Sequence, residues 1–286
     1  MGKVLLSIGH GYSARAIAKG LINDGWTIYA TTRSVEQAKV LQGEGVIPII
    51  WPDTDLTPFI AKATHILSSV APDEYGDAVL RAFDDEIAAQ KDRLEWVGYL
   101  STTGVYGDHD GGWVDEDTPP NPTTRRGKFR QAAEQEWQAL GLPLVIFRLA
   151  GIYGVGRGPF AKLRAGTARC IIKKNQVFSR IHVDDIAQVV IASMKNPDAG
   201  SLFNVCDDDA APPQNVIAYG AKLLGIPAPM PEDFETAEMR PMARSFYAES
   251  KRVRNDRIKQ LLGVTLKFPD YKTGLQALLK TETAPE

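Results

Sequence analysis

The 286-residue sequence has little of several features that mark particular classes of protein. It contains two cysteines, Cys170 and Cys206, which are too few for a disulfide framework and show no Cys/His spacing typical of a zinc site. No apolar run approaches the roughly 18 residues of a membrane span, and the first residues form a strand pattern without a signal peptide. A net charge of −2 argues against a general nucleic-acid binder. We therefore expect a reduced, cytoplasmic protein that binds no metal, membrane or nucleic acid.

What the sequence does contain is a regular alternation of strand and helix patterns. Short apolar runs, expected for strands buried on both faces of a parallel sheet, occur at 4–8, 26–30, 46–50, 64–70, 94–100 and 143–147. Helical patterns lie between them, most clearly at 14–22, 76–91 and 126–140. This order predicts an α/β fold with a doubly wound, mostly parallel sheet of six strands by about residue 148. In such a sheet ligands bind beyond the carboxyl ends of the strands.

The turn after the first predicted strand fits a dinucleotide-binding motif. Gly9, Gly11 and Ala14 give the spacing Gly-x-Gly-x-x-Ala between a strand pattern and a helix pattern. In this motif the glycines permit a tight bend and close approach of a pyrophosphate, which meets free N–H groups such as those of Tyr12 and Ser13. An ordinary glycine turn is the alternative. A nicotinamide dinucleotide is the first ligand to consider, with further contacts expected after the fourth strand, at Ser69 and Val70.

The residues after the second strand favour NADP over NAD. Thr32, Arg33 and Ser34 fall where the adenosine ribose should lie, and residues 31–34 include no acid. An acid would bind a free 2′-hydroxyl, whereas an arginine flanked by hydroxyls suits a 2′-phosphate. Two alternatives stay open, because Ser34 begins a capping-box spacing and Arg33 also fits a solvated surface position. NAD remains possible.

Four later motifs resemble those of a known family. They are Ser-Thr-Thr-Gly-Val-Tyr-Gly at 101–107, Arg-Leu-Ala-Gly-Ile-Tyr-Gly at 148–154, Ile-His-Val-Asp-Asp-Ile-Ala at 181–187 and Phe-Asn-Val at 203–205. Together with the N-terminal turn, their order resembles that of the extended short-chain dehydrogenases/reductases, which include sugar-nucleotide epimerases and dehydratases. His182 in the third motif is expected to order the start of the helix that follows.

The resemblance covers nearly the whole chain and implies two parts. A Rossmann domain would comprise residues 1–150 and 182–205, and bind NAD or NADP. A smaller C-terminal substrate lobe would comprise residues 151–181 and 206–286. The substrate in this family is often a nucleotide sugar, so the resemblance implies a small-molecule substrate of this kind.

The family's catalytic Tyr and Lys are missing from this sequence. In family members they lie four residues apart on one helix, and the phenol exchanges a proton with the substrate. An ungapped comparison over 122–134 puts Arg126 in the Tyr position and Arg130 in the Lys position, while Thr102 matches the catalytic Ser/Thr. A guanidinium with a pKa above about 12 cannot be a general acid near neutrality, so Arg126 does not substitute for the tyrosine. Arg130 can still donate to ribose hydroxyls.

Three hypotheses account for the missing pair. In the first, Tyr106 supplies the proton from the loop that contains Thr102, although the family has a tyrosine here for architecture. In the second, Arg126 stabilises an oxyanion or binds a carboxylate or phosphate. In the third, the protein binds NADP without turnover, as a redox sensor or regulatory module. We favour an NADP-linked epimerase, dehydratase or reductase-like enzyme over the sensor.

Charge and periodicity suggest two further properties. The stretch from Arg157 to Arg180 has no acid, and its basic residues are Arg157, Lys162, Arg164, Arg169, Lys173, Lys174 and Arg180. This imbalance suits an anionic ligand such as a nucleotide diphosphate, and a solvated basic face is the alternative. Helical stretches 76–91 and 126–140 resemble the pair through which family members dimerise, so a homodimer is possible. An apolar stripe would face either the partner or its own sheet, and consists of Val79, Ala82, Phe83 and Ile87.

Overall fold

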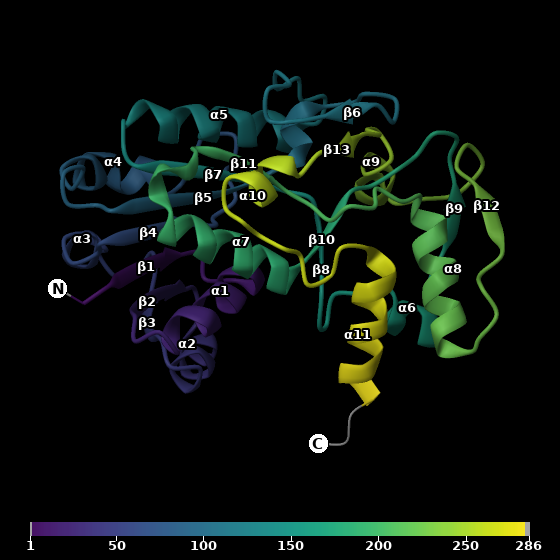
Figure 1. Cartoon of the computed structure of the whole chain (residues 1–286), viewed down its shortest axis with the longest axis horizontal. Coiled ribbons are helices and arrows are strands. Elements are labelled where there is room, and N and C mark those ends of the chain that lie inside the picture. The colour runs from purple at the N-terminus through teal and green to yellow at the C-terminus, as the bar shows by residue number, and fades with distance from the viewer. Residues whose placement is uncertain (1, 284–286) are drawn as a thin grey trace.

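The computed structural model describes residues 2–283, and the predicted boundaries at residues 1 and 286 lie outside this range. A seven-stranded sheet forms the centre of the larger part of the molecule, in the order β11-β7-β5-β4-β1-β2-β3 (Figure 1). All its neighbouring strands are parallel. The strands are β1 (Val4–Ile8), β2 (Thr27–Thr32), β3 (Ile47–Ile50), β4 (His65–Ser68), β5 (Trp96–Thr102), β7 (Leu144–Leu149) and β11 (Leu202–Val205). The six predicted strands are confirmed, and β11 adds a seventh at the edge.

Helices cover both faces of this sheet, which confirms the doubly wound α/β fold (Figure 1). The helices on one face are α1 (Tyr12–Ile22), α2 (Val35–Gly43), α7 (Val183–Lys195) and α10 (Asp256–Gln260). Those on the other face are α3 (Thr57–Ile60), α4 (Leu80–Ala88) and α5 (Arg125–Ala139). From β1 the chain adds β2 and then β3 on one side of the sheet. It then crosses to the other side of β1 to form β4, so the strand order reverses beside β1. Such a switch point is where ligands bind in open α/β sheets.

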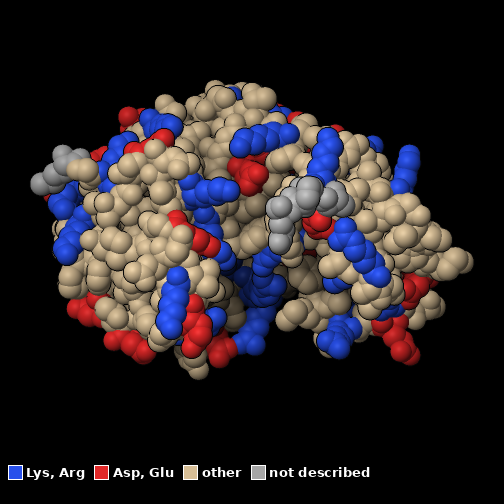
Figure 2. Space-filling model, turned by 90° about the horizontal axis from the view of Figure 1, so that it is seen from below, with Lys and Arg blue, Asp and Glu red and all other residues tan. Residues whose placement is uncertain are grey.

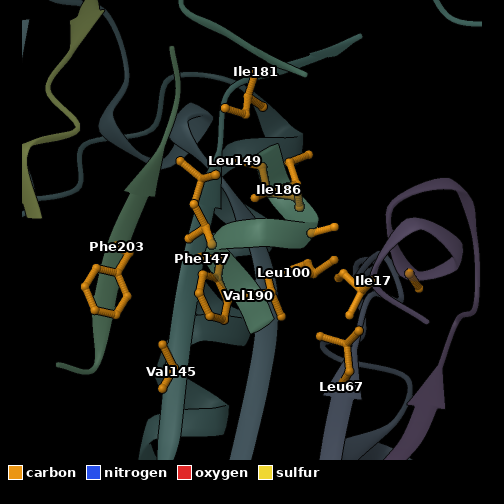
Figure 3. Close-up of a cluster of buried hydrophobic side chains, with 14 of the residues drawn as sticks. Ile17, Leu67, Leu100, Val145, Phe147, Leu149, Ile181, Ile186, Val190 and Phe203 are labelled. Atoms are coloured by element: carbon orange, nitrogen blue, oxygen red, sulfur yellow. The ribbon is translucent and has the colours of Figure 1, made fainter. Parts of the chain in front are cut away.

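Apolar side chains fill the space between each layer of helices and the sheet. Figure 3 shows part of the first cluster, where Ile186 and Val190 of α7 lie against Phe147 and Leu149 of β7. The runs that identified the strands are buried on both faces, since alternate residues enter opposite clusters. In β1, for example, Leu5 enters the first cluster and Leu6 the second. This two-sided burial explains why the strands are almost continuously apolar.

A smaller C-terminal lobe lies beside the sheet, at the right of Figure 1, as predicted. Its helices are α6 (Phe160–Arg164), α8 (Pro213–Leu224) and α11 (Tyr271–Thr283), which pack around a third apolar cluster. Within the lobe β9 (Cys170–Ile172) pairs with β12 (Pro231–Asp233). Two parallel pairs complete the described strands, β8 (Gly151–Tyr153) with β10 (Arg180–His182) and β6 (Trp113–Val114) with β13 (Arg252–Val253). None of the helices within residues 2–283 is long and apolar enough to cross a membrane.

The apolar stripe offered as a dimer surface packs inside its own chain. Val79, Phe83 and Ile87 are buried in the second cluster, against the sheet, and only Ala82 is exposed. Of the two alternatives that the sequence left open, the structure therefore shows the second, in which the stripe covers its own sheet. The homodimer stays a prediction without this support.

Candidate active site

A cleft of about 760 Å³ lies at the carboxyl ends of the central strands. Its wall combines the turn after β1, the loops after β4, β5 and β7, the start of α5, and segment 245–253, which begins at the last residue of α9 (Pro241–Ser245). The size suits a small-molecule or cofactor site. Figure 2 shows basic side chains gathered in a hollow between the two parts of the molecule. The cleft therefore occupies the position that the sequence predicted for the ligand.

The glycine turn is shaped so that only a glycine fits its first position. Gly9 has a φ of 78°, and a Cβ there would lie 2.9 Å from Val70 Cγ2. The Ser69 hydroxyl donates to the Gly9 carbonyl at 2.6 Å and fixes the turn against the end of β4. Gly11 then precedes α1, whose first turn has no acidic residue and presents N–H groups without intrahelical acceptors. Backbone N–H groups and the helix dipole thus face the cleft as a ready site for a phosphate.

The predicted cofactor residues divide between the cleft and its surroundings. Those lining the cleft are Gly9, Gly11, Tyr12, Ser13, Ala14, Ser69 and Arg130. Val70 packs beneath the turn. The remaining three lie at the end of β2, outside the cleft wall, and are Thr32, Arg33 and Ser34.

At the end of β2 the hydroxyls of Thr32 and Ser34 accept hydrogen bonds from nearby backbone N–H groups, whereas the Arg33 side chain makes no such bond. Ser34 is the N-cap of α2 and accepts the Gln37 N–H at 3.1 Å, which is the capping role left open by the sequence. Thr32 Oγ1 accepts the Ser34 N–H at 3.5 Å. Arg33 is exposed, and its guanidinium has no partner anywhere in the described chain. Of the three residues, Arg33 is the one whose polar side-chain groups have no intramolecular bond.

Tyr12 joins the glycine turn to the loop after β8. Its phenol donates to the Val155 carbonyl at 2.9 Å, and the Arg157 guanidinium lies over its ring at 4.8 Å. A Cβ on Gly154 would lie 2.4 Å from Tyr12 Oη, so this glycine makes room for the contact. Burial raises the pKa of Tyr12. The phenol therefore shapes one wall of the cleft through a neutral hydrogen bond.

Thr102 and the start of α5 both line the cleft. Thr102 ends β5, and its Oγ1 accepts the Gly104 N–H at 3.1 Å, which caps η1 (Thr103–Tyr106). Helix α5 packs directly on η1, because a Cβ on Gly127 would lie 2.8 Å from the Gly104 carbonyl oxygen. This close approach brings Arg126 and Arg130 to the same wall as Thr102.

The two arginines of α5 differ in how they are held. Arg130 Nη1 donates to the carbonyls of Val70 and Leu100 at 3.2 and 3.1 Å and to Tyr99 Oη at 2.9 Å, so this nitrogen is fixed at the ends of β4 and β5. Arg126 is exposed, and within residues 2–283 its guanidinium has no bonding partner. Arg130 is thus preorganised, and Arg126 is available to an incoming anion.

Tyr106 points away from the cleft, which corrects the first hypothesis for the missing acid. Its side chain is completely buried (0% exposed), and its hydroxyl donates to Asn204 Oδ1 at 2.7 Å. The Arg148 guanidinium lies over the ring at 4.8 Å, and burial raises the pKa of Tyr106 to about 12. A phenol enclosed in this way cannot reach a substrate in the cleft, so its role is structural.

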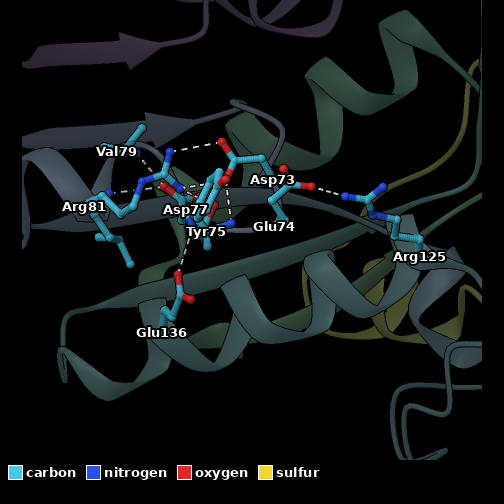
Figure 4. Close-up of polar contacts among 10 residues, drawn as sticks. Asp73, Glu74, Tyr75, Asp77, Val79, Arg81, Arg125 and Glu136 are labelled. Atoms are coloured by element: carbon cyan, nitrogen blue, oxygen red, sulfur yellow. Dashed lines mark hydrogen bonds and ion pairs between the residues drawn. The ribbon is translucent and has the colours of Figure 1, made fainter.

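The loop after β4 is tied to α5 along the edge of the cleft (Figure 4). Arg81 pairs with Asp73 at 2.8 Å, and Glu74 pairs with Arg125 at the start of α5. Further along α5, Glu136 accepts the backbone N–H of Asp77 at 2.9 Å. These contacts hold the loop whose residues 71–72 line the cleft.

The basic stretch from Arg157 to Arg180 contributes less to the cleft than its sequence suggests. Only Arg157 and Arg180 among its basic residues line the wall. Arg164 pairs with Glu282, and Arg169 pairs with Glu232, so acids far along the chain offset part of the charge.

His182 has the local role that the sequence predicted. Its Nδ1 accepts the Asp184 N–H at 3.2 Å and caps α7.

Glu249 and Lys251 are cleft residues that the sequence did not single out. They belong to segment 245–253, and their side chains form an ion pair at 2.8 Å. No motif surrounds them, and they follow α5 by more than a hundred residues. Only the folded chain brings them to the cleft that Thr102 and Arg126 also line.

A parallel sheet with a glycine turn and a cleft at its switch point defines a Rossmann-type dinucleotide-binding protein. Residues 8–206 match the model of the NAD dependent epimerase/dehydratase family, and the chain belongs to this family. It is 26% identical to "Protein YeeZ" of Escherichia coli (strain K12) over 245 residues, which cover 80% of this chain and 86% of that protein.

Solved structures show the same fold. A functionally unknown conserved protein from Silicibacter pomeroyi DSS is 55% identical, with a TM-score of 0.94, over 99% of this chain and 100% of that one. MoeE5 in complex with UDP-glucose and NAD is 19% identical, with a TM-score of 0.74, over 99% of this chain and 100% of that one. The resemblance to the epimerases and dehydratases is thus confirmed.

Proposed function

We propose that this protein is an NADP-linked epimerase, dehydratase or reductase-like enzyme acting on an anionic small molecule such as a nucleotide sugar. One observation carries the proposal: Thr102, Arg126 and Arg130 line a single cleft together with the glycine turn. Membership of the NAD dependent epimerase/dehydratase family supports a nicotinamide dinucleotide. The UDP-glucose and NAD bound to MoeE5, which shares the fold, agree with a nucleotide-sugar substrate.

The residues present fit a dinucleotide along this edge of the sheet. The N–H groups of Tyr12, Ser13 and Ala14 would bind the pyrophosphate, next to the space that Gly9 leaves. Arg33 would pair with the 2′-phosphate that distinguishes NADP from NAD. When bound, the nicotinamide ring exchanges a hydride with a substrate carbon. Residues 1–150 and 182–205 would hold the dinucleotide.

The substrate would lie against Thr102 and the start of α5. The unpaired Arg126 would bind a phosphate or carboxylate, or stabilise a developing oxyanion. Thr102 would donate a hydrogen bond to a substrate oxygen, and Arg130 would orient the ribose with its remaining N–H groups. The predicted lobe of residues 151–181 and 206–286 would close over the substrate, except for α10, which packs on the central sheet.

A non-catalytic redox sensor or regulatory protein is the second candidate. The burial of Tyr106 favours it, because the phenol that was the sequence's candidate for the missing proton donor cannot reach the cleft. The convergence of Thr102 with an unpaired Arg126 in the cleft favours the enzyme.

Calorimetry with NADP(H) and NAD(H) tests the shared first step. We expect binding of at least one of them and tighter binding of the NADP form. A folded protein that binds none of the four at millimolar concentration would rule out both candidates. Turnover of UDP-glucose and related nucleotide sugars is then followed by chromatography of the sugar products, because epimerisation and dehydration return the nicotinamide to its starting oxidation state. The absorbance of the reduced nicotinamide reports net oxidation or reduction, and a dinucleotide-binding protein inactive in both assays favours the sensor.

A further inference from the structure

Few titratable side chains other than arginines line the cleft. Among its lining residues within the described chain, the titratable groups other than arginines are Tyr12, Tyr153, Glu249 and Lys251. Tyr12 donates to the Val155 carbonyl, and Tyr153 donates to the Asp270 carbonyl at 3.4 Å. Burial raises the pKa of both phenols. The remaining acid and amine belong to segment 245–253.

Glu249 is held by contacts from two sides. Its Oε2 accepts from Lys251 Nζ at 2.8 Å, and its Oε1 accepts from the Thr123 hydroxyl at 2.7 Å. Lys251 Nζ also donates to the Gly107 carbonyl. The side chains are 11% and 10% exposed, yet both residues reach the cleft wall. The carboxylate is therefore mostly desolvated and fixed in position, as a proton-transfer group needs to be.

Glu249 is bonded near the part of the chain where the family's catalytic tyrosine is expected. Thr123 immediately precedes Thr124, the N-cap of α5. Arg126 lies in the first turn of that helix, where the ungapped sequence comparison predicts the family's tyrosine position. Glu249 is thus bonded at the start of the helix that holds the catalytic phenol in other members of the family. If the contacts of Glu249 with Thr123 and Lys251 served only to stabilise the fold, the carboxylate would need no access to the cleft. A buried ion pair also adds little net stability in general, so stability alone does not explain this one.

We propose that Glu249, positioned by Lys251 and Thr123, is the proton-transfer group of this site. The inference rests on the proposed function. In oxidation of a substrate alcohol, the C–H hydrogen and its two electrons leave as hydride to the oxidised nicotinamide, which is reduced. The hydroxyl O–H bond breaks as C–O becomes C=O, and its proton goes to a Glu249 carboxylate oxygen. The reverse reaction returns both.

The test compares the affinities of NADP⁺ and NADPH, which differ in the charge of the nicotinamide ring. A carboxylate that faces the ring favours the cationic form. Glu249→Gln should therefore raise the ratio of the NADP⁺ to the NADPH dissociation constant, by about 3-fold to 100-fold for charges about 6 Å apart at an effective dielectric between about 80 and 20. Glu235→Gln is the matched control, since Glu235 is exposed in the same lobe outside the cleft.

Lys251→Met provides a second, independent variant. It removes the positive charge and leaves the carboxylate, so the same ratio should fall. Thermal melting checks that Glu249→Gln is folded. If it is not, the ratio of dissociation constants measured for Lys251→Met tests the inference instead. A ratio that is unchanged in the folded variants overturns the inference while dinucleotide binding stands. Absence of dinucleotide binding by the wild-type protein overturns the proposed function together with the inference.

Discussion

The hydroxyl of Tyr106 donates a hydrogen bond to Asn204 Oδ1 at 2.7 Å, and both residues are completely buried. The bond joins η1 to β11, the edge strand that follows in the chain almost a hundred residues later. On the other side of Asn204, its backbone N–H donates to Glu116 Oε1 at 2.8 Å. The tyrosine therefore anchors the loop that contains Thr102 and takes no part in the cleft.

Tyr106→Phe should lower stability and leave ligand binding unchanged. The substitution leaves Asn204 Oδ1 buried without its donor, and such an unsatisfied group costs about 1 to 3 kcal/mol. Urea denaturation should show a loss of this size in the free energy of unfolding, while calorimetry gives the wild-type NADPH affinity. Lost affinity with wild-type stability would return Tyr106 to the site.

Arg148→Met should be more damaging. Arg148 and Glu134 form a buried ion pair at 2.7 Å beneath the cleft, and removing one partner of such a pair costs about 3 to 5 kcal/mol. The double variant Arg148→Met/Glu134→Gln leaves no unpaired charge and should recover much of that loss in the same denaturation experiment. Equal losses in the single and double variants would contradict this account.

Arg33→Ala should separate NADPH from NADH. Loss of a hydrogen bond to the charged 2′-phosphate should weaken NADPH binding by about 1.5 to 3 kcal/mol, while NADH binding changes little. Lys222→Ala, an exposed substitution on α8, is the control for nonspecific charge effects. Calorimetric losses that are equal for both dinucleotides would remove the argument for NADP.

Arg126→Ala should weaken an anionic substrate more than the dinucleotide. We expect UDP-glucose affinity to fall by about 1.5 to 3 kcal/mol, the range for a hydrogen bond to a charged group. Lys128→Ala is a matched control, because Lys128 is an exposed basic residue of the same helix that does not line the cleft. If both variants bind UDP-glucose equally well, Arg126 is not the anion-binding residue.

Asp207 should make stability fall as the pH rises. Burial raises the pKa of Asp207 to about 8, far above the value of about 3.9 expected in the unfolded chain. Between these values the folded state holds a proton that the unfolded state has released, so the free energy of unfolding decreases with pH by up to about 1.4 kcal/mol per unit. Asp207→Asn should flatten this decline between pH 5 and 8 in urea denaturation. Parallel profiles for the two proteins would contradict the shift.

Local sequence patterns were sufficient for the architecture of the larger part. The apolar runs located the parallel strands to within about two residues, and the capping positions at Ser34 and His182 were both found. These signals succeed because burial periodicity and N-cap hydrogen bonds depend on residues at most a few positions apart. The apolar stripe on α4 was ambiguous for the same reason, since periodicity gives the direction of a face and not what covers it.

The sequence by itself determined the alternation of strands and helices and the glycine turn, and it predicted that Arg126 and Arg130 take the places of the family's Tyr and Lys. Only the tertiary structure decided that Tyr106 is buried beside Asn204, and that Glu249 reaches Thr123 at the start of α5. The physical reason is that these contacts join residues about a hundred or more positions apart. No local periodicity or motif encodes such a pairing, because it is set by how whole layers pack and which loops they bring to one edge of the sheet.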